Sequence, residues 1–156
     1  MYLIDGHNLI PKIRGLTLKQ ADDEQALIDV LQNYKRLSRK KMEVYFDGAP
    51  LDQAGPRKMG GIQTYFIKLG QTADDAIVLR LRNMGKRAKQ ITVVTSDRRI
   101  IREAQAVHAS VISSEEFAKQ IEKTLTSSPS GGKPDPSRMS ESELENWLNL
   151  FNKKSS

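Results

Sequence analysis

The sequence predicts an α/β fold in which a doubly wound, mainly parallel sheet is flanked by helices. Two observations support this prediction. Short apolar segments alternate with segments of helical period over residues 1–125, and the most apolar segment, residues 91–95, is rich in β-branched side chains. Alternating strands and helices are typical of parallel sheets, and a nearly continuous apolar strand indicates burial on both faces. A length of 156 residues fits one ordinary domain.

The beginning of the chain predicts two strands separated by a helix. Residues 1–4 are apolar and stop at an Asp-Gly pair that starts with Asp5, so a strand is expected to end there. Residues 44–46 are apolar and stop at a second Asp-Gly pair, which starts with Asp47. The helix between them is predicted from apolar side chains spaced three and four residues apart. These side chains are Leu27, Val30, Leu31 and Tyr34.

The next segment predicts a loop followed by a strand. Residues 49–61 contain two prolines and three glycines, and we expect them to form a long loop that carries the basic pair Arg57 and Lys58. Apolar and polar side chains then alternate over residues 62–69, which indicates a strand.

The remaining elements continue the alternation. Thr72 is expected to cap a helix with two aspartates in its first turn. Residues 91–95 predict the central strand, and Asp97 follows it before another helix. Residues 107–112 predict a short strand, and residues 113–125 predict a capped amphipathic helix.

Composition divides the chain into three parts. Residues 1–126 are expected to form the folded domain, and residues 127–139, which are rich in Ser, Gly and Pro, are expected to be a flexible linker. Residues 140–152 predict a short amphipathic helix that carries the only Trp of the protein, Trp147. The oligomeric state and the docking site of this helix are left open.

Charge and composition limit the possible functions. The chain has 25 Lys and Arg against 19 Asp and Glu, and residues 124–156 are neutral, so the body carries the whole excess of +6. A basic body favours a polyanionic partner. The absence of Cys and the presence of only two His disfavour thiolate or His-rich metal sites. No apolar run approaches the ~18 residues of a membrane span, and no secretory signal is visible, so we expect a cytoplasmic protein.

Acidic residues occur where several predicted elements begin or end. Asp5, Asp47 and Asp97 each follow a predicted strand, and Asp74 and Asp75 lie at a helix start. The carboxyl ends of parallel strands meet at one edge of a sheet, so we expect these five side chains to converge. Crowded carboxylates repel one another unless a divalent cation lies between them, and oxygen ligands favour Mg²⁺ or Mn²⁺. The alternative interpretation is local: Asp-Gly pairs form turns, and Thr-x-x-Asp caps helices.

Four sequence blocks resemble the signature blocks of NYN domains in the PIN-like nuclease superfamily, and most closely the YacP-like group. The blocks are residues 5–10, 46–48, 72–77 and 94–98, and they occur in the family's order. The resemblance implies a PIN-like sheet, dependence on Mg²⁺ or Mn²⁺, and hydrolysis of RNA phosphodiester bonds. It also implies that the substrate could be mRNA in association with the ribosome.

The resemblance assigns roles to individual residues. The catalytic set that it implies is Asp5, Asn8, Asp74, Asp75 and Asp97. The metal ligands that it implies are Asp5, Asp47, Asp74, Asp75 and Asp97, of which Asp47 is the weakest match. His7 stands where relatives often carry Tyr, and we expect it to pack or stack rather than to catalyse.

Basic side chains near these acids are candidates for RNA contact. They are Arg57, Lys58, Arg98, Arg99 and Arg102. Three functions therefore stay open at this point: a metal-dependent endoribonuclease, which we favour, a catalytically silent RNA- or ribosome-binding protein, and a structure-specific DNA nuclease. The endoribonuclease is favoured because converging carboxylates repel phosphate unless a metal ion is present.

Overall fold

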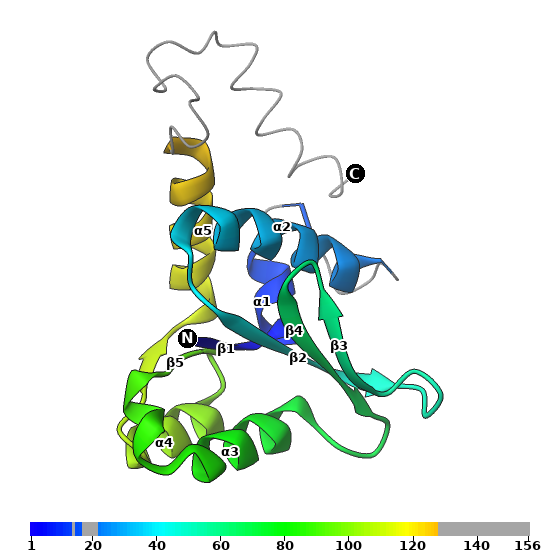
Figure 1. The fold of residues 1–156 in the computed structure, drawn as a ribbon, viewed down its shortest axis with the longest axis vertical. Helices are drawn as coiled ribbons and strands as arrows, with labels where there is room; N and C mark the ends of the chain where they lie inside the picture. Colours follow the sequence, from blue (N-terminus) through cyan, green and yellow to red (C-terminus); the bar gives the residue numbers. More distant parts are fainter. Residues whose placement is uncertain (14, 17–21, 128–156) are drawn as a thin grey trace, which may run out of the picture.

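A computed structural model of the chain describes residues 1–13, 15, 16 and 22–127. A six-stranded sheet forms the centre of the fold, and its strands lie in the order β3-β4-β2-β1-β5-β6 (Figure 1). The strands are β1 Tyr2–Asp5, β2 Met42–Ala49, β3 Gly55–Met59, β4 Ile62–Lys68, β5 Thr92–Val94 and β6 Ser110–Ile112. The α-helices are α1 Gly6–Leu9, α2 Asp23–Ser38, α3 Ala73–Met84, α4 Arg98–Ala106 and α5 Ser114–Ser127. Two 3-10 helices, η1 Ile10–Lys12 and η2 Gly85–Gln90, complete the elements.

The sheet is parallel except for β3, which confirms the predicted fold class. The first strand lies at its centre: β1 pairs in parallel with β2 on one side and with β5 on the other. Only the edge strand β3 runs antiparallel to its neighbour β4. Chain order therefore reverses at β1, and a ligand site is expected outside the carboxyl ends of the strands at such a point.

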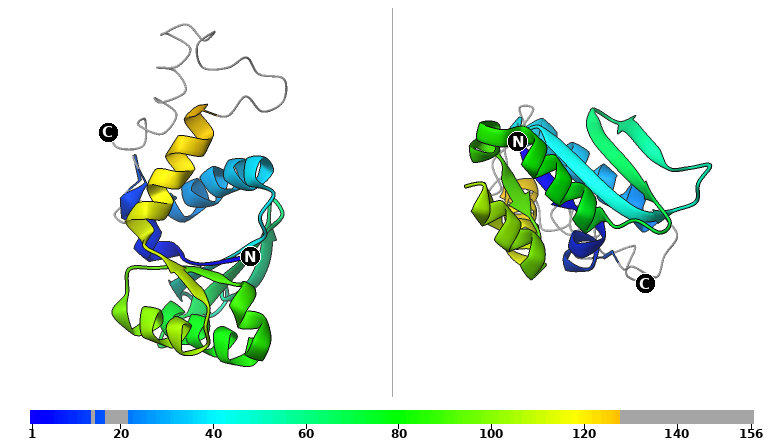
Figure 2. Two further views of the ribbon diagram at one scale, coloured as in Figure 1. Left: turned by 90° about the vertical axis from the view of Figure 1, so that its left-hand side faces the viewer. Right: turned by 90° about the horizontal axis from the view of Figure 1, so that it is seen from below.

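Helices cover both faces of the sheet, and each face has its own core. Neighbouring residues of β1 point to opposite faces, with Ile4 in one core and Leu3 in the other. The core around Ile4 lies beneath α2 and α5, whereas the core around Leu3 lies against α3 and α4. Figures 1 and 2 show these two helix pairs on opposite sides of the sheet.

The predicted loop over residues 49–61 was wrong in its second half. Residues 55–59 form β3, which pairs with β4 in a hairpin. Only Gly60 and Gly61 lie between the two strands, with φ values of 58° and 84°. A two-residue hairpin turn with positive φ at both positions favours glycine, so the Gly-Gly pair ends one strand and starts the next. Arg57 and Lys58 therefore lie on an edge strand.

Two other predicted boundaries also differ from the structure. Asp47 lies within β2 rather than after it, because the strand continues to Ala49 through a shift of register. Gly48 has a φ of 80° at this shift. The strand predicted over residues 107–112 begins at Ser110, since His108, with a φ of 64°, lies in the turn that precedes it.

The predicted linker over residues 127–139, apart from Ser127, and the predicted helix over residues 140–152 lie outside the described residues. The division of the chain at residue 126 stays a prediction. Across the described part of the chain, no helix has the length and apolar character that crossing a membrane requires.

Candidate active site

Asp5 lies at the centre of the site, where β1 ends. Its side chain is only 6% exposed. The chain turns directly into α1 at Gly6, where an added Cβ would overlap the ring of Phe46, so only glycine fits. Burial, then the charge of Asp74 and the charge of Asp47, raise the pKa of Asp5, which lies at about 7. The backbone N–H of Asn8 and the charge of His7 act in the opposite direction.

Asp74 faces the same region from the first turn of α3. Burial raises the pKa of Asp74, and the nearby carboxylate of Asp97 raises it further through charge and hydrogen bonding. Asp97 is the N-cap of α4: its Oδ1 accepts hydrogen bonds from the backbone N–H groups of Arg99 at 2.9 Å and Ile100 at 3.2 Å. Capping holds this carboxylate at the end of β5, opposite Asp74.

Asp47 joins β2 to the start of α3 and to α1. Its Oδ2 accepts a hydrogen bond from the backbone N–H of Ala73 at 3.3 Å, and its Oδ1 lies 3.0 Å from Nδ1 of His7. The other ring nitrogen of His7 lies 2.6 Å from Oε2 of Glu24 on α2. The hydrogen bond with Glu24 is the largest of the interactions that raise the pKa of His7. An imidazolium donates from both nitrogens, so it satisfies both carboxylates.

His7 also contacts an aromatic ring, with its ring centroid 5.2 Å from that of Phe46. The imidazole therefore packs against the sheet and bridges two acids.

Asp75 differs from its neighbour Asp74. It forms an ion pair, in which its Oδ1 lies 2.5 Å from Nη2 of Arg99, and none of the other four acids is among the groups that shift its pKa. This ion pair lowers the pKa of Asp75. Its backbone N–H donates to Oγ1 of Thr72 at 3.1 Å, which confirms the predicted helix cap.

Asn8 on α1 is hydrogen-bonded to the segment before α4 and to the start of α5. Its Oδ1 accepts hydrogen bonds from the backbone N–H of Ser96 at 2.9 Å and from Oγ of Ser114 at 2.5 Å. Ser96 precedes Asp97, and Ser114 begins α5. Asn8 thus connects α1 to the segment that presents Asp97 and to the start of α5.

The structure links four of the five predicted acids electrostatically through Asp74, which interacts with Asp5, Asp47 and Asp97. We call Asp5, Asp47, Asp74 and Asp97 the acidic cluster. Within residues 1–13, 15, 16 and 22–127, no three acidic or histidine side chains converge closely enough to ligate one ion as they stand. The donor set nevertheless suits a hard divalent cation, since all its side-chain donors are carboxylate oxygens, and burial together with their mutual repulsion raises the pKa of Asp5 and Asp74.

The predicted RNA-contacting residues lie on two sides of this cluster. Arg98 and Arg102 are exposed on α4, whereas Arg99 is engaged by Asp75. Arg57 and Lys58 are exposed on β3. Only Arg57 of these two makes a described aromatic contact: its Cζ lies 4.7 Å from the centroid of the Phe66 ring.

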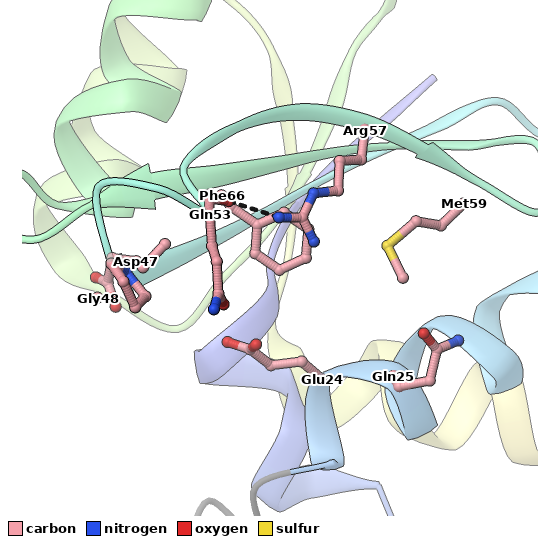
Figure 3. A pocket seen from close by; sticks show the side chains of 10 residues that line it. Glu24, Gln25, Asp47, Gly48, Gln53, Arg57, Met59 and Phe66 are labelled. Carbon is pink, nitrogen blue, oxygen red and sulfur yellow. Dashed lines mark hydrogen bonds between the residues drawn. The ribbon is translucent and has the colours of Figure 1, made fainter.

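A pocket of about 250 Å³ adjoins the acidic cluster and shares Asp47 with it (Figure 3). Glu24 and Gln25 line it from α2, and Arg57 and Phe66 line it from the β3–β4 hairpin. Sequence reasoning missed Glu24 as part of this region, since an acid at a helix start is explained by the helix dipole alone. No local pattern links Glu24 to His7; packing of α2 beside α1 brings them together.

Comparisons with known proteins identify the family and support the fold. The family model described as "YacP-like NYN domain" matches residues 2–153. A crystal structure of Rae1 (YacP) from Bacillus subtilis matches with a TM-score of 0.64 and 24% identity, covering 98% of this chain and 92% of that chain. The W164L mutant of Rae1 matches with a TM-score of 0.62 and 19% identity, covering 96% and 98%. A comparison with curated protein sequences gave no match.

At these identities the two structures establish a common fold. The family match extends over nearly the whole chain, and NYN domains are nuclease-type domains of the PIN-like superfamily, which indicates a nuclease-type, RNA-related function. The chain belongs to the YacP-like NYN domain family.

Proposed function

We propose that this protein is a metal-dependent endoribonuclease that hydrolyses RNA phosphodiester bonds with Mg²⁺ or Mn²⁺. The observation that carries the proposal is the position of Asp5. It is buried at the end of the central strand, and its pKa is raised to about 7 by burial and by the carboxylates of Asp74 and Asp47. Keeping an acid in such surroundings costs stability unless a cation is bound, so the arrangement suits a metal site.

The proposed ligands are members of the acidic cluster. Asp5, Asp74 and Asp97 would hold the ion, and Asp47 would complete the negative field while it anchors His7 and the start of α3. Asp75, which was also predicted as a ligand, lies outside the cluster, and we propose that it positions Arg99. A bound divalent ion would lower the pKa of a ligated water and neutralise charge that develops on the phosphate.

The basic residues would bind the RNA backbone on either side of the cluster. Three of them are exposed, so their side chains are free to contact the phosphate groups of an RNA strand on the surface: Arg98 and Arg102 on α4, and Lys58 on β3. The excess positive charge of the body favours association with a polyanion, and the affinity is expected to fall as salt rises. Asn8 contributes indirectly, through its hydrogen bonds to Ser96 and Ser114.

The test is cleavage of end-labelled single-stranded RNA by the purified chain with Mg²⁺, with Mn²⁺ and with EDTA. A second assay, in which an mRNA is bound to ribosomes, tests the substrate that the family resemblance implies. We expect cleavage that requires the metal and is abolished in Asp5→Asn and in Asp97→Asn. Glu116→Gln, which removes an exposed acid from the first turn of α5, serves as the matched control.

The outcomes separate the three functions considered. If the protein binds RNA but cleaves neither free RNA nor RNA on ribosomes, it is a catalytically silent RNA-binding protein. Cleavage of a DNA strand of the same sequence, with RNA left intact, would make the protein a DNA nuclease. Manganese binding measured by titration calorimetry, weakened in Asp5→Asn and unchanged in Glu116→Gln, checks the metal site independently of cleavage.

A further inference from the structure

The pocket beside the acidic cluster has the features of a binding site for a single unstacked base. Its residues that matter here are Glu24, Gln25, Gln53, Arg57, Met59 and Phe66. We infer that this pocket binds one nucleobase of the RNA strand, and that it prefers bases with an exocyclic amino group over uracil. The inference rests on the proposal that RNA is the substrate and names the part of the site that reads it.

The pocket has a planar platform that is held in place before any ligand binds. The guanidinium of Arg57 lies over the Phe66 ring, with 4.7 Å from Cζ to the ring centroid. Its Nη2 donates a hydrogen bond to the carbonyl oxygen of Gln53 at 2.8 Å. Phe66 in turn stacks on Phe46, with 5.6 Å between centroids and 29° between ring planes. Unstacked RNA bases stack on aromatic rings and on guanidinium planes.

The size and charge of the pocket favour a base rather than a phosphate group. A volume of about 250 Å³ lies just below the ~300 to 1,000 Å³ of pockets for drug-sized ligands, so it suits one ring system. The carboxylates of Glu24 and Asp47 line it, and His7 and Arg57 balance their charge. A phosphate would meet two carboxylates there, whereas a neutral base would not be repelled.

Acceptor oxygens on the α2 side of the pocket provide the preference. Glu24 uses Oε2 to accept a hydrogen bond from His7, and Oε1 has no hydrogen-bond partner among residues 1–13, 15, 16 and 22–127. Gln25 donates through Nε2 to Oδ1 of Asp29 at 3.0 Å, and its amide oxygen has no hydrogen-bond donor within the same described residues. Figure 3 shows Gln53 extending from above toward Glu24. Adenine, cytosine and guanine offer amino donors to such oxygens, whereas uracil offers one N–H between two carbonyl oxygens.

The position of the pocket connects it to the acidic cluster. Asp47 lines the pocket and is also one of the carboxylates whose charge raises the pKa of Asp5 and Asp74. A base held here would therefore belong to a nucleotide close to the phosphate that is cleaved, and the pocket would make cleavage depend on sequence.

The test measures binding of labelled adenine, cytosine and uracil homopolymers to the full chain by fluorescence anisotropy in EDTA, so cleavage does not contribute. We expect the adenine and cytosine strands to bind about tenfold more tightly than the uracil strand, a difference in the range of one stacked and hydrogen-bonded base. Arg57→Lys keeps the charge but removes the planar platform, and we expect it to reduce this preference to within about twofold.

Lys58→Ala is the matched control. Lys58 follows Arg57 on β3, and consecutive strand residues point to opposite faces, so its loss should weaken binding to all three strands equally. Circular dichroism and thermal melting check that the variants fold. Gln25→Met, which keeps the length of the side chain and removes the acceptor, should narrow the preference while Lys58→Ala leaves it intact.

Equal affinity of the unaltered chain for the three strands would overturn the inference, as would a complete lack of binding or an Arg57→Lys variant that keeps the preference. These results are distinguishable from failure of the proposed nuclease. If the protein discriminates bases in EDTA but never cleaves RNA, the base-binding pocket stands and the proposed nuclease activity is refuted. If it cleaves RNA with metal but shows no base preference, the nuclease activity stands and the base-binding pocket is refuted.

Discussion

Asp75 and Arg99 form an ion pair in which Oδ1 of Asp75 lies 2.5 Å from Nη2 of Arg99. The pair joins the first turn of α3 to the first turn of α4, and both side chains are half-exposed or more, with 60% and 50% of their surface accessible. A predicted metal ligand and a predicted RNA contact thus bind each other. The neighbouring Asp74 faces Asp97 instead.

Asp74→Asn and Asp75→Asn are therefore expected to differ in their effect on RNA cleavage. Loss of a direct metal ligand should lower the cleavage rate by more than the ~10- to 100-fold that follows loss of a residue that only orients a ligand. We expect Asp74→Asn to exceed about 100-fold and Asp75→Asn to stay below about tenfold. Single-turnover cleavage rates at saturating Mn²⁺ provide the measurement. Equal losses in the two variants would contradict the assignment of Asp74 to the acidic cluster.

Asp5→Asn should stabilise the metal-free protein at high pH. The pKa of Asp5 is about 7 in the folded state against an ordinary value of 3.8, so the folded state binds the proton more tightly. Tighter proton binding by Asp5 therefore stabilises the folded state. This stabilisation is complete below pH 3.8 and is lost as pH rises through about 7. At pH 8 the ionised carboxylate costs up to about 4 kcal/mol, which Asn would not incur.

Urea unfolding in EDTA at pH 5 and pH 8 measures this effect. The free energy of unfolding of the variant should exceed that of the unaltered chain at pH 8, and the difference should shrink at pH 5. Added Mn²⁺ should stabilise the unaltered chain and leave the variant nearly unchanged. An Asp5→Asn protein that is less stable at pH 8 would show that Asp5 ionises without strain.

Asn8→Ala should lower both stability and cleavage. Its side-chain oxygen accepts from Ser96 and from Ser114, whose side chain is fully buried. Removing the shared acceptor leaves a buried hydroxyl unsatisfied, which costs about 1 to 3 kcal/mol. Ser114→Ala, which removes the hydroxyl itself, should cost less. Thermal melting ranks the two variants, and the reverse order would refute this role of Asn8.

The Glu43–Arg80 pair is expected to contribute more to stability than an exposed pair on the same helix. Arg80 donates to both carboxylate oxygens of Glu43, at 3.1 and 2.8 Å, and the Tyr45 hydroxyl donates to one of them at 2.9 Å. Glu43 is 7% exposed. Arg80→Met would leave this carboxylate buried without its cation, at a cost of about 3 kcal/mol or more.

Arg82→Met is the control for this prediction. Arg82 also lies on α3 and pairs with Glu103 at 3.0 Å, but its side chain is largely exposed, so its removal should cost below about 1 kcal/mol. Denaturant unfolding of both variants at neutral pH measures the contrast. Similar losses would mean that burial does not set the contribution of the Glu43 pair.

The order of the elements and the edge at which the acids lie could be predicted from the sequence. Asp5 and Asp97 each follow an apolar strand. In a parallel sheet the carboxyl ends of neighbouring strands lie side by side, so strand positions alone place these acids together. The hairpin of β3 and β4 was missed, because prolines and glycines are typical of loops. Residues 55–59 form a strand because they pair with β4 across the Gly60-Gly61 turn, and this pairing is a feature of the tertiary structure.

The sequence by itself determined most of the elements, though not β3, and the edge at which several carboxylates meet, because side-chain periodicity and turn residues act over a few neighbouring positions. The tertiary structure alone decided which carboxylate of the adjacent pair Asp74 and Asp75 faces the others, and that Glu24 reaches His7. Adjacent residues in a helix differ by about 100° in direction. Their roles therefore depend on how α3 packs against the sheet, which involves residues far apart in the chain.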